Sequence, residues 1–174
     1  MRNFITNAFA AAVVVGTLAA SAPSSAETQT SKDRLVGAWH LVAFKATTGD
    51  QTNRPLGEHP GGYVGFSPTR FWVMILDTDR KAPASATLTD AEAVSLMKSS
   101  VSYTGNYTAD SAQTPDGIKV TVHVDAATNP AITGTDRVFF MRVEGDKLTI
   151  KSPAVLIPTT GQTSVVQLDL VKTD

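Results

Sequence analysis

Short apolar segments separated by turn residues recur along this chain, and this pattern limits the possible folds more than any other feature of the sequence. The clearest segment is 102–108, where Tyr103, Gly105 and Tyr107 alternate strictly with polar residues. Successive side chains of a β-strand point to opposite faces, so strict alternation predicts a strand with one buried face. The chain lacks the regular strand and helix alternation of parallel sheets, and we therefore expect an antiparallel β domain.

Eight segments are predicted as strands: 35–46, 63–66, 70–76, 102–108, 118–126, 135–143, 148–151 and 164–171. In the first strand, alternation predicts one face with Trp39, Leu41 and Ala43 and the other with His40, Val42 and Phe44. The segment 47–62 has four Gly and two Pro in sixteen residues and is predicted to be a long loop. Thr89 followed by Glu92 forms a capping-box pattern, which predicts a short amphipathic helix of about ten residues.

These elements predict an all-β fold, an eight-stranded antiparallel up-and-down barrel with one short helix between the third and fourth strands. Closing a sheet removes its exposed edges, and eight strands enclose either a packed interior or room for one small ligand. A sandwich of two sheets has the same alternation and stays open as an alternative.

The first 26 residues have the features of a cleaved signal peptide. Arg2 precedes an apolar, uncharged run at 8–20, and the small residues at 24–26 fit a cleavage site before Glu27. A retained membrane anchor is the alternative, but no basic cluster follows the apolar run. We expect a signal peptide at 1–26, a flexible arm at 27–33 and a single domain at 34–174, periplasmic or secreted, with no membrane anchor after cleavage.

Composition excludes several classes of function. The chain has no cysteine, which excludes disulfides, thiolate metal sites and a cysteine nucleophile. The net charge is −1, and the charged residues are scattered along the chain without a basic patch. We therefore expect no nucleic-acid partner. No phosphate-binding glycine loop or dinucleotide motif occurs, and the three histidines have no metal-binding spacing, so we expect no cofactor and no metal. Oligomeric state is left open.

Aromatic, histidine and arginine side chains of the central strands are the candidate ligand-binding residues: Tyr63, Trp72, Tyr103, Tyr107, His123, Arg137 and Phe139. Tyr103 and Tyr107 share a strand face and would either line a pocket or fill the core. Trp39 is expected to be structural, closing one end of the barrel.

His123 shares its strand face with Thr121 and Asp125, while three valines form the other face. If the valines point outward, His123 lies in the cavity and is the candidate acid–base group of an enzyme; if they point inward, His123 is a surface residue. Arg137 and Arg142 lie on opposite faces of one strand, and Arg137 is the better candidate to anchor an anionic ligand.

Several motifs resemble those of the bacterial and fungal lipocalin-like domain family. They are the Gly37-x-Trp39 opening, Pro55-Leu56-Gly57-Glu58 with Gly62-Tyr63, Tyr103-x-Gly105-x-Tyr107, His123 before Pro130, Gly134-Thr135, and the turn 144–148. Where the family is expected to carry an arginine after Gly134-Thr135, this chain has Phe139, with Arg137 two residues earlier on the same face. The resemblance implies a calycin-like barrel with one closed end; most members of the family have no assigned ligand, and some fungal relatives act in natural-product biosynthesis.

Three functions are compatible with these features. The first is a non-enzymatic barrel that binds a small apolar or amphiphilic ligand in its interior. The second is an isomerase or cyclase that uses the pocket together with a proton donor such as His123 or a tyrosine. The third is a periplasmic protein-binding module that uses the loops at 47–62 and 77–87.

Overall fold

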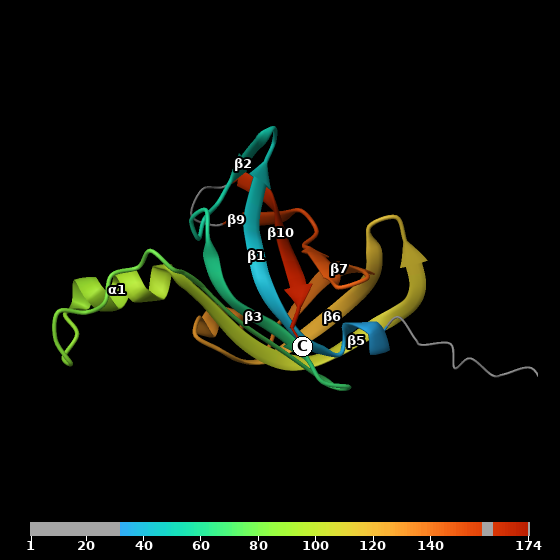
Figure 1. Cartoon of the computed structure of the whole chain (residues 1–174), viewed down its shortest axis with the longest axis horizontal. Helices are drawn as coiled ribbons and strands as arrows, with labels where there is room; N and C mark the ends of the chain where they lie inside the picture. Colours follow the sequence, from blue (N-terminus) through green and yellow to red (C-terminus); the bar gives the residue numbers. More distant parts are fainter. Residues whose placement is uncertain (1–31, 158–161, 174) are drawn as a thin grey trace, which may run out of the picture.

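The computed structural model describes residues 32–157 and 162–173, which form an all-β antiparallel sheet with one short α-helix (Figure 1). The strands are β1 (Gly37–Thr48), β2 (Gln51–Asn53), β3 (Pro60–Phe66), β4 (Arg70–Asp77), β5 (Ser100–Thr114), β6 (Gly117–Ala127), β7 (Asp136–Glu144), β8 (Lys147–Lys151), β9 (Val155–Ile157) and β10 (Gln162–Lys172). The helical elements are η1 (Asp33–Leu35), α1 (Asp90–Lys98) and η2 (Pro130–Ile132). The signal peptide predicted at 1–26, and the arm up to residue 31, lie outside the described residues.

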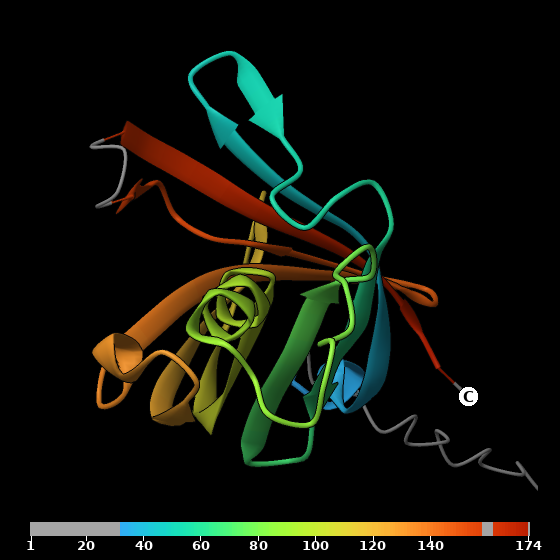
Figure 2. The ribbon, with the colours of Figure 1, turned by 90° about the vertical axis from the view of Figure 1, so that its left-hand side faces the viewer.

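The sheet closes on itself because β1 pairs with β10 as well as with β3. Its order is β2-β1-β3-β4-β5-β6-β7-β8-β10-β9, so eight strands form a closed ring of pairings while β2 and β9 extend from β1 and β10. Figure 2 shows the ring from the side on which α1 lies. The sandwich alternative is excluded by this continuous pairing.

The structure corrects the predicted strand count, because the described residues contain ten strands rather than eight. One addition, β2, lies in the segment 47–62 that was predicted to be a loop. The chain reverses at Gly49, whose φ of 57° favours glycine, and β2 pairs back onto β1. The second addition is β9, which pairs with the start of β10. Counting β2, the helix follows the fourth strand instead of the third.

The alternation predicted for β1 is interrupted by a β-bulge. Its register against β10 shifts between Leu41 and Ala43, and Val42 is exposed. An extra residue in one strand reverses which face the following side chains occupy. Phe44 therefore packs against the core, on the same side as Trp39 and Leu41, and not on the opposite face.

The core lies inside the ring and is built from the alternating apolar residues of all eight strands. On β6 the valines at 120, 122 and 124 are fully buried, which resolves the two orientations left open by the sequence: the valines point inward. At the end of the ring that holds η1, Trp39 is fully buried and its Nε1 donates a hydrogen bond of 2.8 Å to the carbonyl oxygen of Leu35. The structural role predicted for Trp39 is confirmed.

Helix α1 begins at the predicted capping box. The Oγ1 of Thr89 accepts a hydrogen bond of 3.3 Å from the backbone N–H of Glu92, and a carboxylate oxygen of Glu92 accepts one of 2.8 Å from the backbone N–H of Thr89. The pKa of Glu92 is held below its ordinary value because its carboxylate accepts hydrogen bonds, first from the backbone N–H of Ala84 and then from the backbone N–H and the hydroxyl of Thr89. The helix buries none of its residues, and it projects from one side of the sheet (Figure 1).

Candidate functional site

A cavity of about 570 Å³ lies inside the ring, on the side of α1 and η2. Pockets of this size accommodate small organic ligands. Strands from opposite walls of the ring contribute apolar side chains to it: Phe44, Val73, Ile75, Val101, Phe139, Val155, Val166 and Leu168. The lining is therefore mostly apolar, as in sites that bind hydrophobic molecules.

Polar and charged lining residues gather at one edge of the ring. Lys98 ends α1, Ser100 begins β5, Thr128 follows β6, and Arg137 is the second residue of β7. Because β5, β6 and β7 are antiparallel neighbours, the start of β5, the end of β6 and the start of β7 meet at the same edge. The cavity consequently has a polar edge and an apolar interior.

Tyr103 lines the cavity next to Arg137. Its ring packs against that of Phe71, with centroids 5.6 Å apart. Burial raises the pKa of Tyr103 to about 12, although the positive charge of Arg137 acts in the opposite direction. The phenol therefore stays protonated at neutral pH and remains able to donate a hydrogen bond.

Arg137 is half-buried, and its guanidinium forms no hydrogen bond or ion pair with any other residue in 32–157 or 162–173. The other charged residue of the lining is Lys98, and no aspartate or glutamate of the described chain lines the cavity. The neighbouring Asp136 lies on the outer face, where it pairs with His123. The cavity is thus positively charged at its polar edge.

A family model for a lipocalin-like domain matches residues 36–170, from just before β1 to within two residues of the end of β10. The chain belongs to the lipocalin-like domain family. The resemblance inferred from the motifs is confirmed by this match. No curated protein and no solved structure matches the chain at a significant level.

The structure brings three of the predicted site residues of this lipocalin-like domain together: Tyr103, Arg137 and Phe139 line the cavity. Tyr107 points to the same interior face but lies outside the lining. Its ring meets that of Phe66 edge-on at 5.4 Å, and its hydroxyl donates a hydrogen bond of 2.9 Å to the carbonyl oxygen of Ser67. Of the two tyrosines, one lines the pocket and the other fills the core.

Tyr63 and Trp72 lie on the outer face of the lipocalin-like sheet, with 44% and 41% of their surfaces exposed. Tyr63 packs edge-on against His40, and the indole of Trp72 covers Gly65 on the neighbouring strand. Neither side chain lines the cavity, so their predicted placement in the interior is corrected. On these strands Val64 and Val73, the neighbours of Tyr63 and Trp72, occupy inward positions.

His123 also lies on the outer face, because the valines of β6 fill the interior. Its Nδ1 is 2.9 Å from Oδ1 of Asp136, and its side chain is 60% exposed. The orientation that would place His123 in the cavity as an acid–base group is therefore wrong. Among residues 32–157 and 162–173, no cluster of histidine, aspartate and glutamate side chains has a metal-binding arrangement.

Several lining residues escaped prediction. Phe44 was assigned to the wrong face because the bulge in β1 has no clear sequence signal. Met97 and Lys98 reach the cavity from α1, and Ile132 reaches it from η2, which follows Pro130. Val101 extends the alternation of Tyr103 toward the start of β5, and that periodicity could have identified it.

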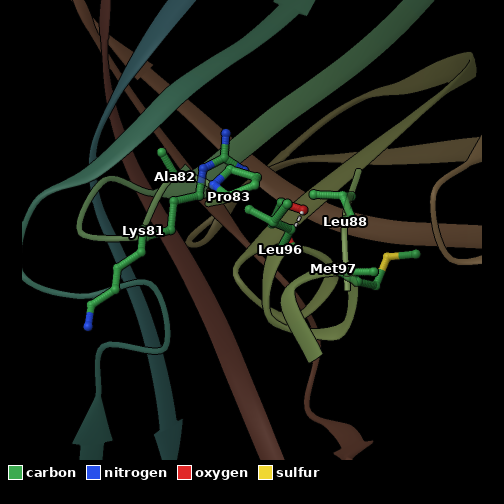
Figure 3. A pocket seen from close by; sticks show the side chains of 9 residues that line it. Lys81, Ala82, Pro83, Leu88, Leu96 and Met97 are labelled. Carbon is green, nitrogen blue, oxygen red and sulfur yellow. Dashed lines mark hydrogen bonds between the residues drawn. The ribbon is translucent and has the colours of Figure 1, made fainter. Parts of the chain in front are cut away.

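A second, shallower groove of about 640 Å³ lies between α1 and the segment that precedes it (Figure 3). Leu96 lies beside Ala82 and Pro83, whereas the side chain of Lys81 extends away from them. Met97 borders both this groove and the interior cavity, so α1 stands at the entrance to the site. In the described part of the chain, no helix has the length and apolar character required to cross a membrane.

Proposed function

We propose that this lipocalin-like domain is an eight-stranded up-and-down barrel that binds a small apolar or amphiphilic molecule in its interior. The observation that carries the proposal is the cavity of about 570 Å³, which is mostly apolar yet has polar groups at one edge. A cavity with this distribution removes apolar ligand surface from water and leaves a polar end near solvent.

A carrier or sensor role is favoured over an isomerase or cyclase. The histidine expected to transfer protons lies on the outer face, paired with Asp136. Tyr103 lines the cavity, but the pKa of its phenol is raised to about 12, so it donates a hydrogen bond and gives up its proton poorly at neutral pH. Binding without chemical conversion requires only the shape and polarity described above.

We further propose that the domain acts after export, in the periplasm or outside the cell, once a signal peptide at 1–26 has been removed. The support is the sequence: Arg2, the apolar run at 8–20 and the small residues at 24–26. Mass spectrometry of the protein recovered from an expressing bacterium tests this proposal. A mature N-terminus at Glu27 would support it, and an intact N-terminus in the cytoplasmic fraction would refute it.

The binding proposal is tested with the neutral fluorescent probe N-phenylnaphthylamine, which brightens in apolar surroundings. We expect a saturable increase in fluorescence with the wild-type domain. A Val101→Phe, Val166→Phe double variant places two rings in the cavity and should weaken binding by about tenfold or more. The control is Val42→Phe, which adds the same ring on the outer face of β1.

Absence of saturable binding to the wild type would refute the proposal. Equal affinity of the double variant and the wild type would also refute it, because the probe would then bind elsewhere. Circular dichroism of each variant shows that the fold is retained.

A further inference from the structure

We infer that the ligand of this domain carries a carboxylate, and that Arg137 binds this carboxylate at the polar edge of the cavity while the apolar part of the ligand extends inward. This inference rests on the proposed ligand-binding function and deepens it. Three features of the lining support it: its positive charge, the lack of a partner for Arg137 in the described chain, and the change from a polar edge to an apolar interior.

The charge of the lining has one sign. Lys98 and Arg137 are its two charged residues, and no carboxylate of the described chain lines the cavity. An apolar cavity lined by cations alone attracts anions and disfavours cations, because charges interact more strongly where water is displaced.

Arg137 lacks a partner in the described chain. The other arginine of the strand, Arg142, faces outward and lies 3.8 Å from a carboxylate oxygen of Glu144. The guanidinium of Arg137 is half-buried and forms no such contact within residues 32–157 and 162–173. A half-buried charge without a partner is unfavourable, and a bound carboxylate would relieve this cost.

The geometry of a guanidinium selects the head group. Its planar donors match the two oxygens of a carboxylate and form paired hydrogen bonds. Tyr103 lies close enough to Arg137 for the arginine charge to act on its hydroxyl, and the phenol is protonated at neutral pH. The two side chains thus present hydrogen-bond donors, and no negatively charged side chain of the described lining competes with the ligand for them.

The position of Arg137 also sets the direction of the ligand. Arg137 lies near the start of β7, and Phe139 follows it on the same inward face toward the middle of the strand. Val73 and Leu168, from the middle of β4 and β10, line the cavity beyond it. A ligand bound through its head group at Arg137 would therefore place its tail against these apolar side chains.

The test compares three probes with the same alkyl chain: dodecanoate, dodecanol and dodecyltrimethylammonium, each used below its micelle concentration. Each probe competes with N-phenylnaphthylamine for the wild-type domain. We expect dodecanoate to bind at least about tenfold more tightly than dodecanol, as for a charge-assisted hydrogen-bonded pair, and the cation to bind most weakly.

The variant Arg137→Gln should lose most of the preference for dodecanoate over dodecanol, because Lys98 is then the only charged residue that remains in the described lining. The matched control is Arg142→Gln, which removes an arginine from the outer face of the same strand and should keep the preference for dodecanoate. A preference for dodecanoate as large in Arg137→Gln as in the wild type would overturn the inference, as would equal binding of the two probes by the wild type.

A second measurement needs no variant. Carbon NMR of carboxyl-labelled dodecanoate bound to the wild type reports the pKa of its carboxyl group, which Arg137 should lower relative to the same acid in a neutral apolar site. A pKa as high as that of the same acid in a neutral apolar site would overturn the inference. If dodecanol and N-phenylnaphthylamine bind but dodecanoate has no advantage, only the carboxylate inference fails; if none of the probes binds, the proposed function fails with it.

Discussion

Gly105 on β5 faces the backbone carbonyl of His123 on β6 so closely that a β-carbon at position 105 would overlap the carbonyl oxygen. The approach occurs where the register of the two strands shifts, between Thr104 and Gly105. Glycine in the Tyr103-x-Gly105-x-Tyr107 motif is therefore required by the close approach of two backbones, and not only by the gap it leaves between two tyrosine rings.

Replacement of this glycine should be costly. We expect Gly105→Ala to lower the free energy of unfolding by about 3 kcal/mol, because the added carbon meets backbone atoms of His123 and Val124 that cannot move aside without breaking the strand pairing. The control is Gly61→Ala, whose β-carbon would meet the methyl of exposed Thr78 and no backbone atom; moving that side chain costs at most its hydrogen bond to the carbonyl oxygen of His59. Urea unfolding measures both values, and equal losses in the two variants would contradict the prediction.

Helix α1 should unfold independently of the sheet. Removal of its cap in Thr89→Ala should destabilise the helix by about 1 kcal/mol, since Oγ1 accepts the hydrogen bond of the Glu92 backbone. The helix buries no residue, so the melting temperature of the domain should remain unchanged.

Hydrogen exchange followed by mass spectrometry tests this separation of helix and sheet. Amides of α1 should exchange faster in Thr89→Ala, while those of β5 and β6 keep their protection. The control is Thr108→Ala, an exposed threonine on β5 away from the helix. A lower melting temperature in Thr89→Ala would show that α1 unfolds together with the sheet.

Tyr103 should make the domain less stable at high pH. Its pKa rises from 10.0 to about 12 on folding because burial disfavours the phenolate. The unfolded chain then loses the proton first, so the contribution of Tyr103 to stability is complete below pH 10 and decreases as the pH rises toward about 12. The slope of this loss is about 1.4 kcal/mol for each pH unit.

The difference between the wild type and Tyr103→Phe isolates this effect, because phenylalanine keeps the ring against Phe71 but has no proton to lose. Urea unfolding at several pH values should show a shallower decrease for the variant above pH 10. Parallel curves for the two proteins would mean that Tyr103 titrates equally in the folded and unfolded chains.

Regular alternation was enough to group the side chains of a strand by face, and in β5 and β7 it also indicated the inward face. The pattern of β5 identified Tyr103 as inward, and alternation in β7 placed Arg137 and Phe139 on one face. Prediction failed in β1, where the pairing with β10, and not the sequence of β1 itself, decides which side chains face inward. The bulge in this strand turns Phe44 toward the interior. For β6, alternation defined two faces but could not tell which was buried, and only the closed ring shows that the valines are inside and His123 is outside.

The two tryptophans offer a further test, because they lie on opposite faces of the sheet. Trp39 is fully buried and donates a hydrogen bond to Leu35, so Trp39→Phe should lower the free energy of unfolding by about 2 to 3 kcal/mol through lost packing and an unpaired carbonyl. Trp72 is 41% exposed, and Trp72→Phe should change stability by about 0.5 kcal/mol or less. Neither residue lines the cavity, so both variants should bind N-phenylnaphthylamine as the wild type does. Urea unfolding followed by circular dichroism measures the stabilities, and a larger loss for Trp72→Phe than for Trp39→Phe would contradict the assignment of inner and outer faces.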